Sequence, residues 1–186
     1  HWSFTAQGML SQGWSVIIPS YPQAPDVKIT QITHSISKLV YKILDDCNGP
    51  VRMIGHSAGG HLASRMICKN FLKKNMGDHI EQVISVSGLY DLRPLLMTKL
   101  NDILTLDHEE AVRESCFLYD PIDTKLTCWV GANERPEFLR QNRILAEAWS
   151  KKSKNIESFY DQGKDHFTVI DQLEEKESLL TRSITK

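Results

Sequence analysis

The feature that most constrains this chain is the sequence Gly-His-Ser-Ala-Gly at residues 55–59. It fits the pattern Gly-x-Ser-x-Gly, in which a strained turn between a strand and a helix lifts a serine hydroxyl clear of a sheet. An apolar run precedes it, so we expect a strand over residues 51–55, and a helix-like stretch follows at residues 58–73. The turn is so tight that a side chain at either Gly55 or Gly59 is expected to collide with its surroundings. The pattern therefore predicts a strand–turn–helix unit that presents a nucleophile.

Strand-like and helix-like segments alternate along the whole chain. Such alternation predicts an α/β fold with a mostly parallel sheet and helices on both faces. Residues 91–123 have no clear period, and we expect them to form a small, irregular, cap-like insertion in a single domain that spans residues 1–186. Besides residues 51–55, the expected strands are residues 14–18, 81–87, 126–130 and 156–160, and the expected helices are residues 32–44, 58–73, 136–151 and 167–184.

Composition excludes several classes of function. A net charge of −1 without a basic cluster argues against a nucleic-acid partner. No apolar run approaches the ~20 residues that a membrane span needs. The four cysteines show no metal-ligand spacing with the seven histidines. We therefore expect a cytoplasmic protein that holds no metal and no cofactor, and we expect its thiols to be reduced, with disulfides left open as the alternative.

A serine hydroxyl is a weak nucleophile at neutral pH, so it needs a base, which an acid must orient. His166 lies in a polar loop between the last expected strand and the last expected helix, where a base can reach Ser57. His61 belongs to the helix after the serine, His79 precedes a strand and so lies at the opposite edge of the sheet, and His108 lies in the insertion. We expect His166 to be the base, and a loop histidine that caps a helix is the alternative.

Four carboxylates are candidates for the acid. Glu134 lies in the loop after the strand at residues 126–130, where it can reach His166. Asp91 follows the preceding strand, which is a second place for such an acid. Glu137 lies in a first helical turn, where negative charge commonly answers the helix dipole. We expect Glu134 to be the acid and leave open Asp91, Glu137, Asp165 and the absence of an acid.

Four segments together resemble the arylformamidase (kynurenine formamidase) group of α/β-hydrolases. They are Gly-His-Ser-Ala-Gly-Gly-His-Leu-Ala at 55–63, Ser-Gly-Leu-Tyr-Asp-Leu-Arg-Pro-Leu at 87–95, Pro-Glu-Phe-Leu-Arg-Gln at 136–141 and Asp-His-Phe at 165–167. The resemblance implies the α/β-hydrolase fold, a triad of Ser57, Glu134 and His166, and an oxyanion hole that includes the N–H of Ala58. It also implies hydrolysis of N-formylkynurenine to kynurenine and formate without a metal, and in many members cleavage of simple aryl esters.

One motif of that group has no counterpart here. Its members carry His-Gly-Gly-x-Trp, which supplies half of the oxyanion hole, upstream of a segment like residues 1–4, and nothing in residues 1–56 matches it. We therefore expect the first three strands of the fold to be missing, one of which would lie between residues 14–18 and residues 51–55. Unpaired strands and a lost oxyanion donor lead us to expect a chain that is poorly stable and nearly inactive by itself.

The sequence thus predicts a serine hydrolase that acts on an aryl formamide or a short acyl ester. A general carboxylesterase of the same fold and a non-catalytic binding protein or inactive fragment are the alternatives. The substrate is a small molecule, and a homodimer is compatible with the sequence. Candidates for aromatic contact with the substrate, each of which also fits the core, are Tyr90, Phe117, Tyr119 and Trp129.

Overall fold

A parallel sheet forms the centre of the computed structural model, which describes residues 2–71 and 79–186. Its four strands follow one another across the sheet in chain order, and each neighbouring pair is parallel. The strands lie close to the bounds expected from the sequence. They are β1 (Val51–His56), β2 (Ile80–Val86), β3 (Lys125–Gly131) and β4 (Ile156–Asp161).

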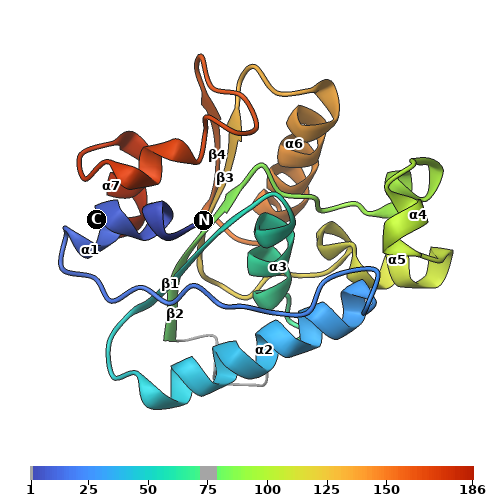
Figure 1. The fold of residues 1–186 in the computed structure, drawn as a ribbon, viewed down its shortest axis with the longest axis horizontal. Coiled ribbons are helices and arrows are strands. Elements are labelled where there is room, and N and C mark those ends of the chain that lie inside the picture. The colour runs from blue at the N-terminus through green and yellow to red at the C-terminus, as the bar shows by residue number, and fades with distance from the viewer. Residues whose placement is uncertain (1, 72–78) are drawn as a thin grey trace.

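Helices cover both faces of this sheet (Figure 1). On one face lie α2 (Ile29–Asp46), α3 (Ala58–Met66) and α6 (Pro136–Ser150), and on the other lie α1 (Gln7–Leu10) and α7 (Leu179–Thr185). A short 3₁₀ helix, η1 (Ser3–Ala6), precedes α1. The predicted α/β architecture is confirmed, as are the helices expected at residues 32–44 and 136–151.

Alternate side chains of the strands explain why both faces need a cover. In β2, Val83 belongs to the core under α2, α3 and α6, whereas Ile84 and Val86 belong to the core under α1 and α7. All three side chains are completely buried. A strand that buries both faces is read in the sequence as a continuous apolar run. Because successive side chains of a strand point to opposite faces of the sheet, one strand contributes to both hydrophobic cores.

Residues 14–18 form no strand in the described part of the chain, so that prediction is wrong. Trp14 and Val16 pack against the core under α7, while Ile17 and Ile18 are 56% and 51% exposed. A strand requires a neighbour that supplies ladder hydrogen bonds, and among the described residues β1 pairs only with β2. The segment is apolar because it packs by alternate side chains, and the strand expected beyond β1 stays a prediction.

The helix predicted at residues 58–73 is shorter than expected. α3 ends at Met66. The backbone of Cys68 then forms an isolated antiparallel β-bridge with that of Pro121. Residues 72 and 73 of the predicted helix lie outside the described residues. The apolar residues after Met66 therefore pack into the core without continuing the helix.

The closing helix predicted at residues 167–184 is divided into η5 (Asp171–Glu174) and α7. Ser178 caps the start of α7, because its hydroxyl accepts the N–H of Thr181. The same hydroxyl donates to the carbonyl of Gln172. Ser178 therefore starts a new helix at a point where the apolar spacing alone predicted none.

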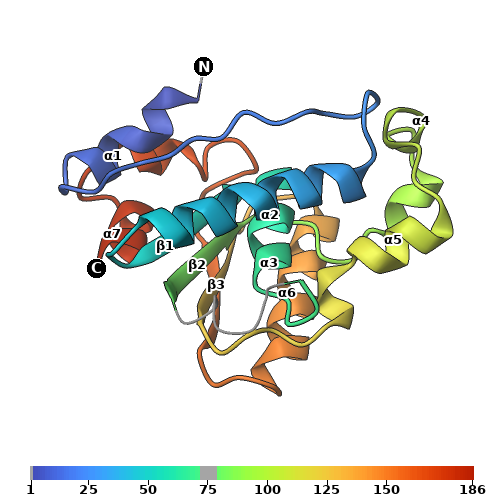
Figure 2. The same ribbon diagram turned by 90° about the horizontal axis from the view of Figure 1, so that it is seen from below.

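The insertion at residues 91–123 is helical rather than irregular. Its elements are too short to produce a recognisable period in the sequence. They are η3 (Arg93–Met97), α4 (Asn101–Leu104), α5 (His108–Glu114) and η4 (Cys116–Leu118). α4 and α5 lie on the side of the molecule opposite to α1 and α7 (Figures 1 and 2). The role of this segment as a cap stays a prediction.

Candidate active site

The carboxyl ends of the parallel strands bring the predicted site residues to one edge of the sheet. Ser57 follows β1, Glu134 follows β3 by three residues, and His166 follows β4 by five. In open α/β sheets this edge is where ligands bind. The topology therefore assembles the three residues that the sequence singled out.

Ser57 occupies a strained turn between β1 and α3. Its φ of 56° and ψ of −116° are a conformation that residues with a side chain rarely adopt. Its N–H donates to the carbonyl of Val86 at the end of β2, with an N···O distance of 2.9 Å. The neighbouring strand thus holds the strained turn in place.

The two flanking glycines differ, and one of the two predictions is wrong. A Cβ at Gly55 would lie 2.0 Å from the carbonyl oxygen of Gly59, whereas a Cβ at Gly59 would meet nothing within 4 Å. The second crowded position is Gly60, where a Cβ would lie 2.8 Å from the Cα of Gly88. α3 therefore approaches β1 closely at Gly55 and approaches the end of β2 closely at Gly60.

This asymmetry predicts unequal effects of alanine at the two positions. Gly55→Ala is expected to lower the free energy of unfolding by about 3 kcal/mol or more, because the clash is with backbone and no rotamer relieves it. Gly59→Ala is expected to stay within about 1 kcal/mol of the parent protein, because the site is open and helical. Denaturant unfolding of the protein from its complete reading frame measures both, and equal losses would contradict the asymmetry.

Ser57, His166 and Glu134 form a continuous hydrogen-bonded series. The Nε2 atom of His166 lies 3.1 Å from the Oγ atom of Ser57. The Nδ1 atom of His166 lies 2.7 Å from the Oε2 atom of Glu134. Because a carboxylate only accepts hydrogen bonds, Nδ1 carries the proton, and Nε2 is left to accept the proton of the serine hydroxyl. This is the arrangement that an activated serine requires.

Glu134 is buried and holds its charge through hydrogen bonds. Burial by itself raises the pKa of the Glu134 carboxyl, but hydrogen bonds from His166, from the Ser87 hydroxyl and from the N–H of Gly131 together lower it below its ordinary value. The carboxylate is therefore ionised at neutral pH. An ionised acid at this place keeps the imidazole in the required tautomer.

The loops that carry the acid and the histidine hold each other. The N–H groups of Ala132 and Asn133 donate to the carbonyls of Asp161 and Lys164, at 2.8 and 2.9 Å. A Cβ at Gly131 would lie 2.5 Å from the carbonyl oxygen of Lys164. A glycine at the end of β3 thus allows the close approach that sets the distance between Glu134 and its partner.

Ala58 follows the nucleophile as the first residue of α3. No side chain among the described residues caps this helix through its N-cap position. The free N–H groups of a helix N-terminus carry partial positive charge, which favours a developing oxyanion. The role of the Ala58 N–H in an oxyanion hole stays a prediction, and its place at an uncapped helix start is suited to it.

His56, between Gly55 and Ser57, makes a contact near the site that the sequence did not predict. Its Nε2 atom lies 2.7 Å from the backbone carbonyl oxygen of His166, to which it donates, and the two rings are 4.7 Å apart. Burial first, and then the neighbouring His166, lower the pKa of His56, so it is neutral at pH 7. His56 therefore ties the histidine loop to the turn that carries the nucleophile.

The half-buried His56 and the buried His61 predict a pH-dependent stability. Burial also lowers the pKa of His61, whose Nε2 atom donates to the carbonyl of Glu114. Because the pKa values of His56 and His61 are lower in the folded chain than the ordinary 6.5, the unfolded chain binds more protons below pH 6.5. The melting temperature is expected to fall between pH 6.5 and 5, and His61→Gln is expected to flatten that fall. A constant melting temperature from pH 7 to 5 would contradict this account.

The alternative acids have other partners. Asp91 accepts from Arg93 through both carboxylate oxygens, at 2.8 and 3.0 Å. Glu137 accepts from Arg140, and Asp165 accepts from backbone groups of its own turn. None of the three has a described hydrogen bond to the imidazole of His166. The structure therefore brings only Glu134 of the four candidates to that ring.

Aromatic side chains near the site are not the ones that the sequence suggested. Tyr90 and Trp129 are 0% and 2% exposed and belong to the two cores, so the core alternative holds for them. Next to His166 lie Phe138, with its ring centroid 4.2 Å away, and Phe167, at 5.5 Å and 74% exposed. The other two suggested residues, Phe117 and Tyr119, are partly buried against the core.

Cysteines and acidic residues form no metal site in the part of the chain that the structure describes. All four cysteines are free thiols, of which Cys68, Cys116 and Cys128 are buried. None of the described helices has the length and hydropathy needed to span a membrane.

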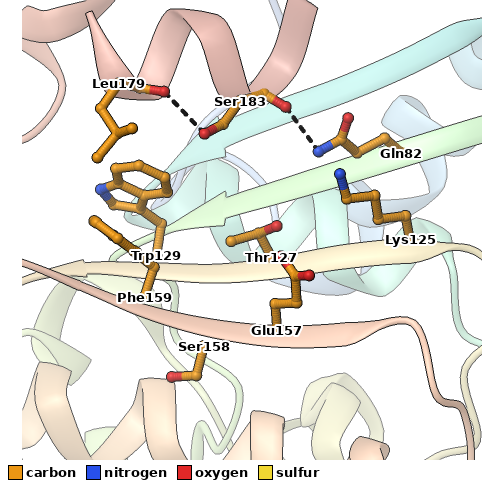
Figure 3. A pocket seen from close by; sticks show the side chains of 9 residues that line it. All are labelled: Gln82, Lys125, Thr127, Trp129, Glu157, Ser158, Phe159, Leu179 and Ser183. Atoms are coloured by element: carbon orange, nitrogen blue, oxygen red, sulfur yellow. Dashed lines mark hydrogen bonds between the residues drawn. The ribbon is translucent and has the colours of Figure 1, made fainter. Parts of the chain in front are cut away.

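A separate hollow of about 370 Å³ lies between the sheet and α7 (Figure 3). Two of its polar side chains have structural contacts, since Gln82 donates to the carbonyl of Ser183 and the Ser183 hydroxyl donates to that of Leu179. The side chain of Ser158 points to the other face of the sheet, where it accepts from Asn142 of α6. The described residues that line this hollow include no histidine.

Comparison with curated proteins gives a consistent relationship. No family model matches the chain. Kynurenine formamidases of Danio rerio and Salmo salar are 29% and 28% identical to it, over 98% of this chain and 65% of each relative. That of Drosophila melanogaster is 24% identical, over 88% of this chain and 59% of its own length. The chain thus spans about two thirds of the length of the fish enzymes.

Solved structures show the same fold. A protein from Silicibacter sp. TM1040, described provisionally as a thioesterase, is 41% identical with a TM-score of 0.92, over 100% of this chain and 69% of that one. An esterase from Pyrobaculum calidifontis is 15% identical with a TM-score of 0.75, over 98% of this chain and 68% of that one. The chain therefore belongs to the α/β-hydrolases, and among them its sequence resembles those of the kynurenine formamidases.

Proposed function

We propose that the protein is a serine hydrolase that cleaves the formamide of an aryl compound, with N-formylkynurenine as its substrate and kynurenine and formate as its products. The observation that carries the proposal is the series of contacts from Ser57 through His166 to Glu134. The similarity to kynurenine formamidases supports the choice of a formamide. A cytoplasmic location, expected from the cysteines, stays a prediction.

The first half of the reaction transfers the formyl group to the enzyme. The Oγ atom of Ser57 attacks the formyl carbon while Nε2 of His166 takes the hydroxyl proton. Glu134 stabilises the imidazolium that forms, and the N–H of Ala58 donates to the oxyanion. Collapse of the tetrahedral intermediate breaks the bond from carbon to the aryl nitrogen. His166 returns its proton to that nitrogen, and the aryl amine leaves.

The second half releases formate. Water gives a proton to His166 and attacks the formyl ester of Ser57, again through a tetrahedral oxyanion. The ester bond then breaks, the serine oxygen regains the proton from His166, and formic acid leaves and loses its remaining proton to water as formate. The same steps cleave a short acyl ester, whose leaving group is an alcohol in place of an amine.

A general carboxylesterase is the second candidate, because solved esterases share the fold. The two candidates differ in the leaving group that they accept. The test therefore compares three substrates: N-formyl-L-kynurenine, p-nitrophenyl acetate and an acyl thioester. The protein for this assay is expressed from its complete reading frame. Formamide turnover with kcat/KM of about 10⁴ M⁻¹s⁻¹ or more is the expected result.

Other outcomes select the alternatives. Turnover of the ester or thioester alone would indicate a general esterase or thioesterase of this fold. Absence of all turnover, together with a serine that does not react with a fluorophosphonate, would favour a binding protein without catalysis. Only an activated serine reacts quickly with that reagent.

A further inference from the structure

Ser87, directly after β2, has a backbone conformation that a glycine would adopt more easily. Its φ is 52°, and its side chain is completely buried. A residue with a Cβ is strained in such a region, whereas glycine is not. A strained serine at this place therefore suggests that the hydroxyl has a task that glycine could not perform.

The hydroxyl of Ser87 contacts the candidate acid. It donates to Oε1 of Glu134 at 2.5 Å, and the N–H of Gly131 donates to the same oxygen at 2.9 Å. The other carboxylate oxygen, Oε2, faces Nδ1 of His166 at 2.7 Å. The two oxygens are thus divided between two tasks, since one is held by two fixed donors and the other is left for the imidazole.

The end of β2 contacts both the nucleophile turn and the acid. The carbonyl of Val86 accepts the N–H of Ser57, and the hydroxyl of the next residue, Ser87, reaches Glu134. The N–H of Ser87 in turn donates to the carbonyl of Trp129 in β3, at 2.7 Å. Because β2 lies between β1 and β3, these two residues fix the position of the acid relative to the nucleophile.

We propose that Ser87 is a positioning residue for the reaction: its hydroxyl fixes the plane of the Glu134 carboxylate so that Oε2 points at His166. It does not touch the substrate. The proposal rests on the serine hydrolase function proposed above, and it adds a fourth residue whose loss lowers kcat and leaves KM unchanged.

Ser87→Gly is the decisive variant, because glycine removes the hydroxyl and also relieves the positive φ. Its melting temperature is expected to stay close to that of the parent protein, because relief of the strain offsets the lost hydrogen bond, whereas kcat is expected to fall about 10- to 100-fold, the effect of one hydrogen bond to a charged group. Ser87→Ala, which keeps the strain, is expected to lose activity to the same extent. Thr105→Gly is the matched control, because it relieves a similar φ of 51° at the C-cap of α4, where Thr105 has no described hydrogen bond to Ser57, His166 or Glu134; its activity is expected to be unchanged.

A double-mutant cycle separates positioning from a structural effect. In a Glu134→Ala background the Ser87 hydroxyl has no carboxylate to hold, so Ser87→Gly is expected to cause no further loss of kcat. The same fold-loss in both backgrounds would overturn the proposal, as would a Ser87→Gly variant with unchanged kcat. If Ser57→Ala keeps full turnover, the proposed function itself fails. An inactive Ser57→Ala beside a fully active Ser87→Gly refutes the positioning role alone.

Discussion

Ser57→Ala is expected to lower kcat/KM for the best substrate of the protein by about 10⁵-fold or more. In the proposed mechanism, alanine removes the oxygen that forms the acyl intermediate and leaves His166 without a proton to accept. Steady-state hydrolysis of N-formyl-L-kynurenine or p-nitrophenyl acetate measures the loss. Labelling by a fluorophosphonate is expected to disappear in the same variant, since the reagent bonds to the serine oxygen.

Ser64→Ala is the matched control for this experiment. Ser64 lies in α3, seven residues after Ser57, and its hydroxyl is buried without a hydrogen-bond partner among the described residues. Removing an unpaired buried hydroxyl costs no hydrogen bond. The control is therefore expected to keep full activity and labelling. A Ser57→Ala variant as active as this control would mean that hydrolysis uses a different group.

The sequence revealed those parts of the fold in which a local pattern and the tertiary environment agree. α2 was recognisable because Ile36, Val40 and Leu44 recur every four residues and are all buried. β2 was recognisable because its apolar run is buried on both faces. In these segments each local preference matches the final packing, which is why they could be located to within a few residues.

The errors fall where a neighbour decides the outcome. Residues 14–18 have the composition of a strand, but pairing depends on a partner that composition does not reveal. The break before α7 depends on the hydroxyl of Ser178, which caps a helix only if the chain has already turned there. Neither effect leaves a periodic signal in the sequence.

In the candidate site too, some residues could be predicted from the sequence and others could not. Ser57, Glu134 and His166 were found because each follows a recognisable strand, and parallel strands bring their carboxyl ends together. Ser87 was missed although it also follows a strand and begins the segment at 87–95, because that segment assigns the serine no role and its partner is 47 residues away. His56 was missed for a similar reason, since it contacts a backbone carbonyl 110 residues away. Residues that support a site through contacts distant in sequence need the structure to be seen.

Glu134→Gln is expected to lower kcat by about 10⁴-fold while the fold stays intact. The amide oxygen can still accept from the Ser87 hydroxyl and from the N–H of Gly131, so the side chain keeps its place. Its NH₂ group then faces Nδ1 of His166 and donates to it. The imidazole must carry its proton on Nε2, where it can no longer accept the proton of Ser57. The loss therefore comes from the wrong tautomer rather than from unfolding.

Glu137→Gln is the matched control. It makes the same chemical change three residues further on, where the carboxylate pairs with Arg140 at the surface, and it is expected to keep near-parent activity.

The pH dependence of stability gives a second readout of the Glu134→Gln variant. Because the pKa of Glu134 is lowered from 4.5, its ionised form stabilises the parent protein above that pH, and this contribution is lost as the pH falls through the lowered pKa. The glutamine variant lacks this contribution, so the difference in melting temperature between the two proteins is expected to shrink on acidification below pH 4.5. A Glu134→Gln variant with near-normal kcat would show that the carboxylate does not orient His166, and the acid would then have to be sought elsewhere.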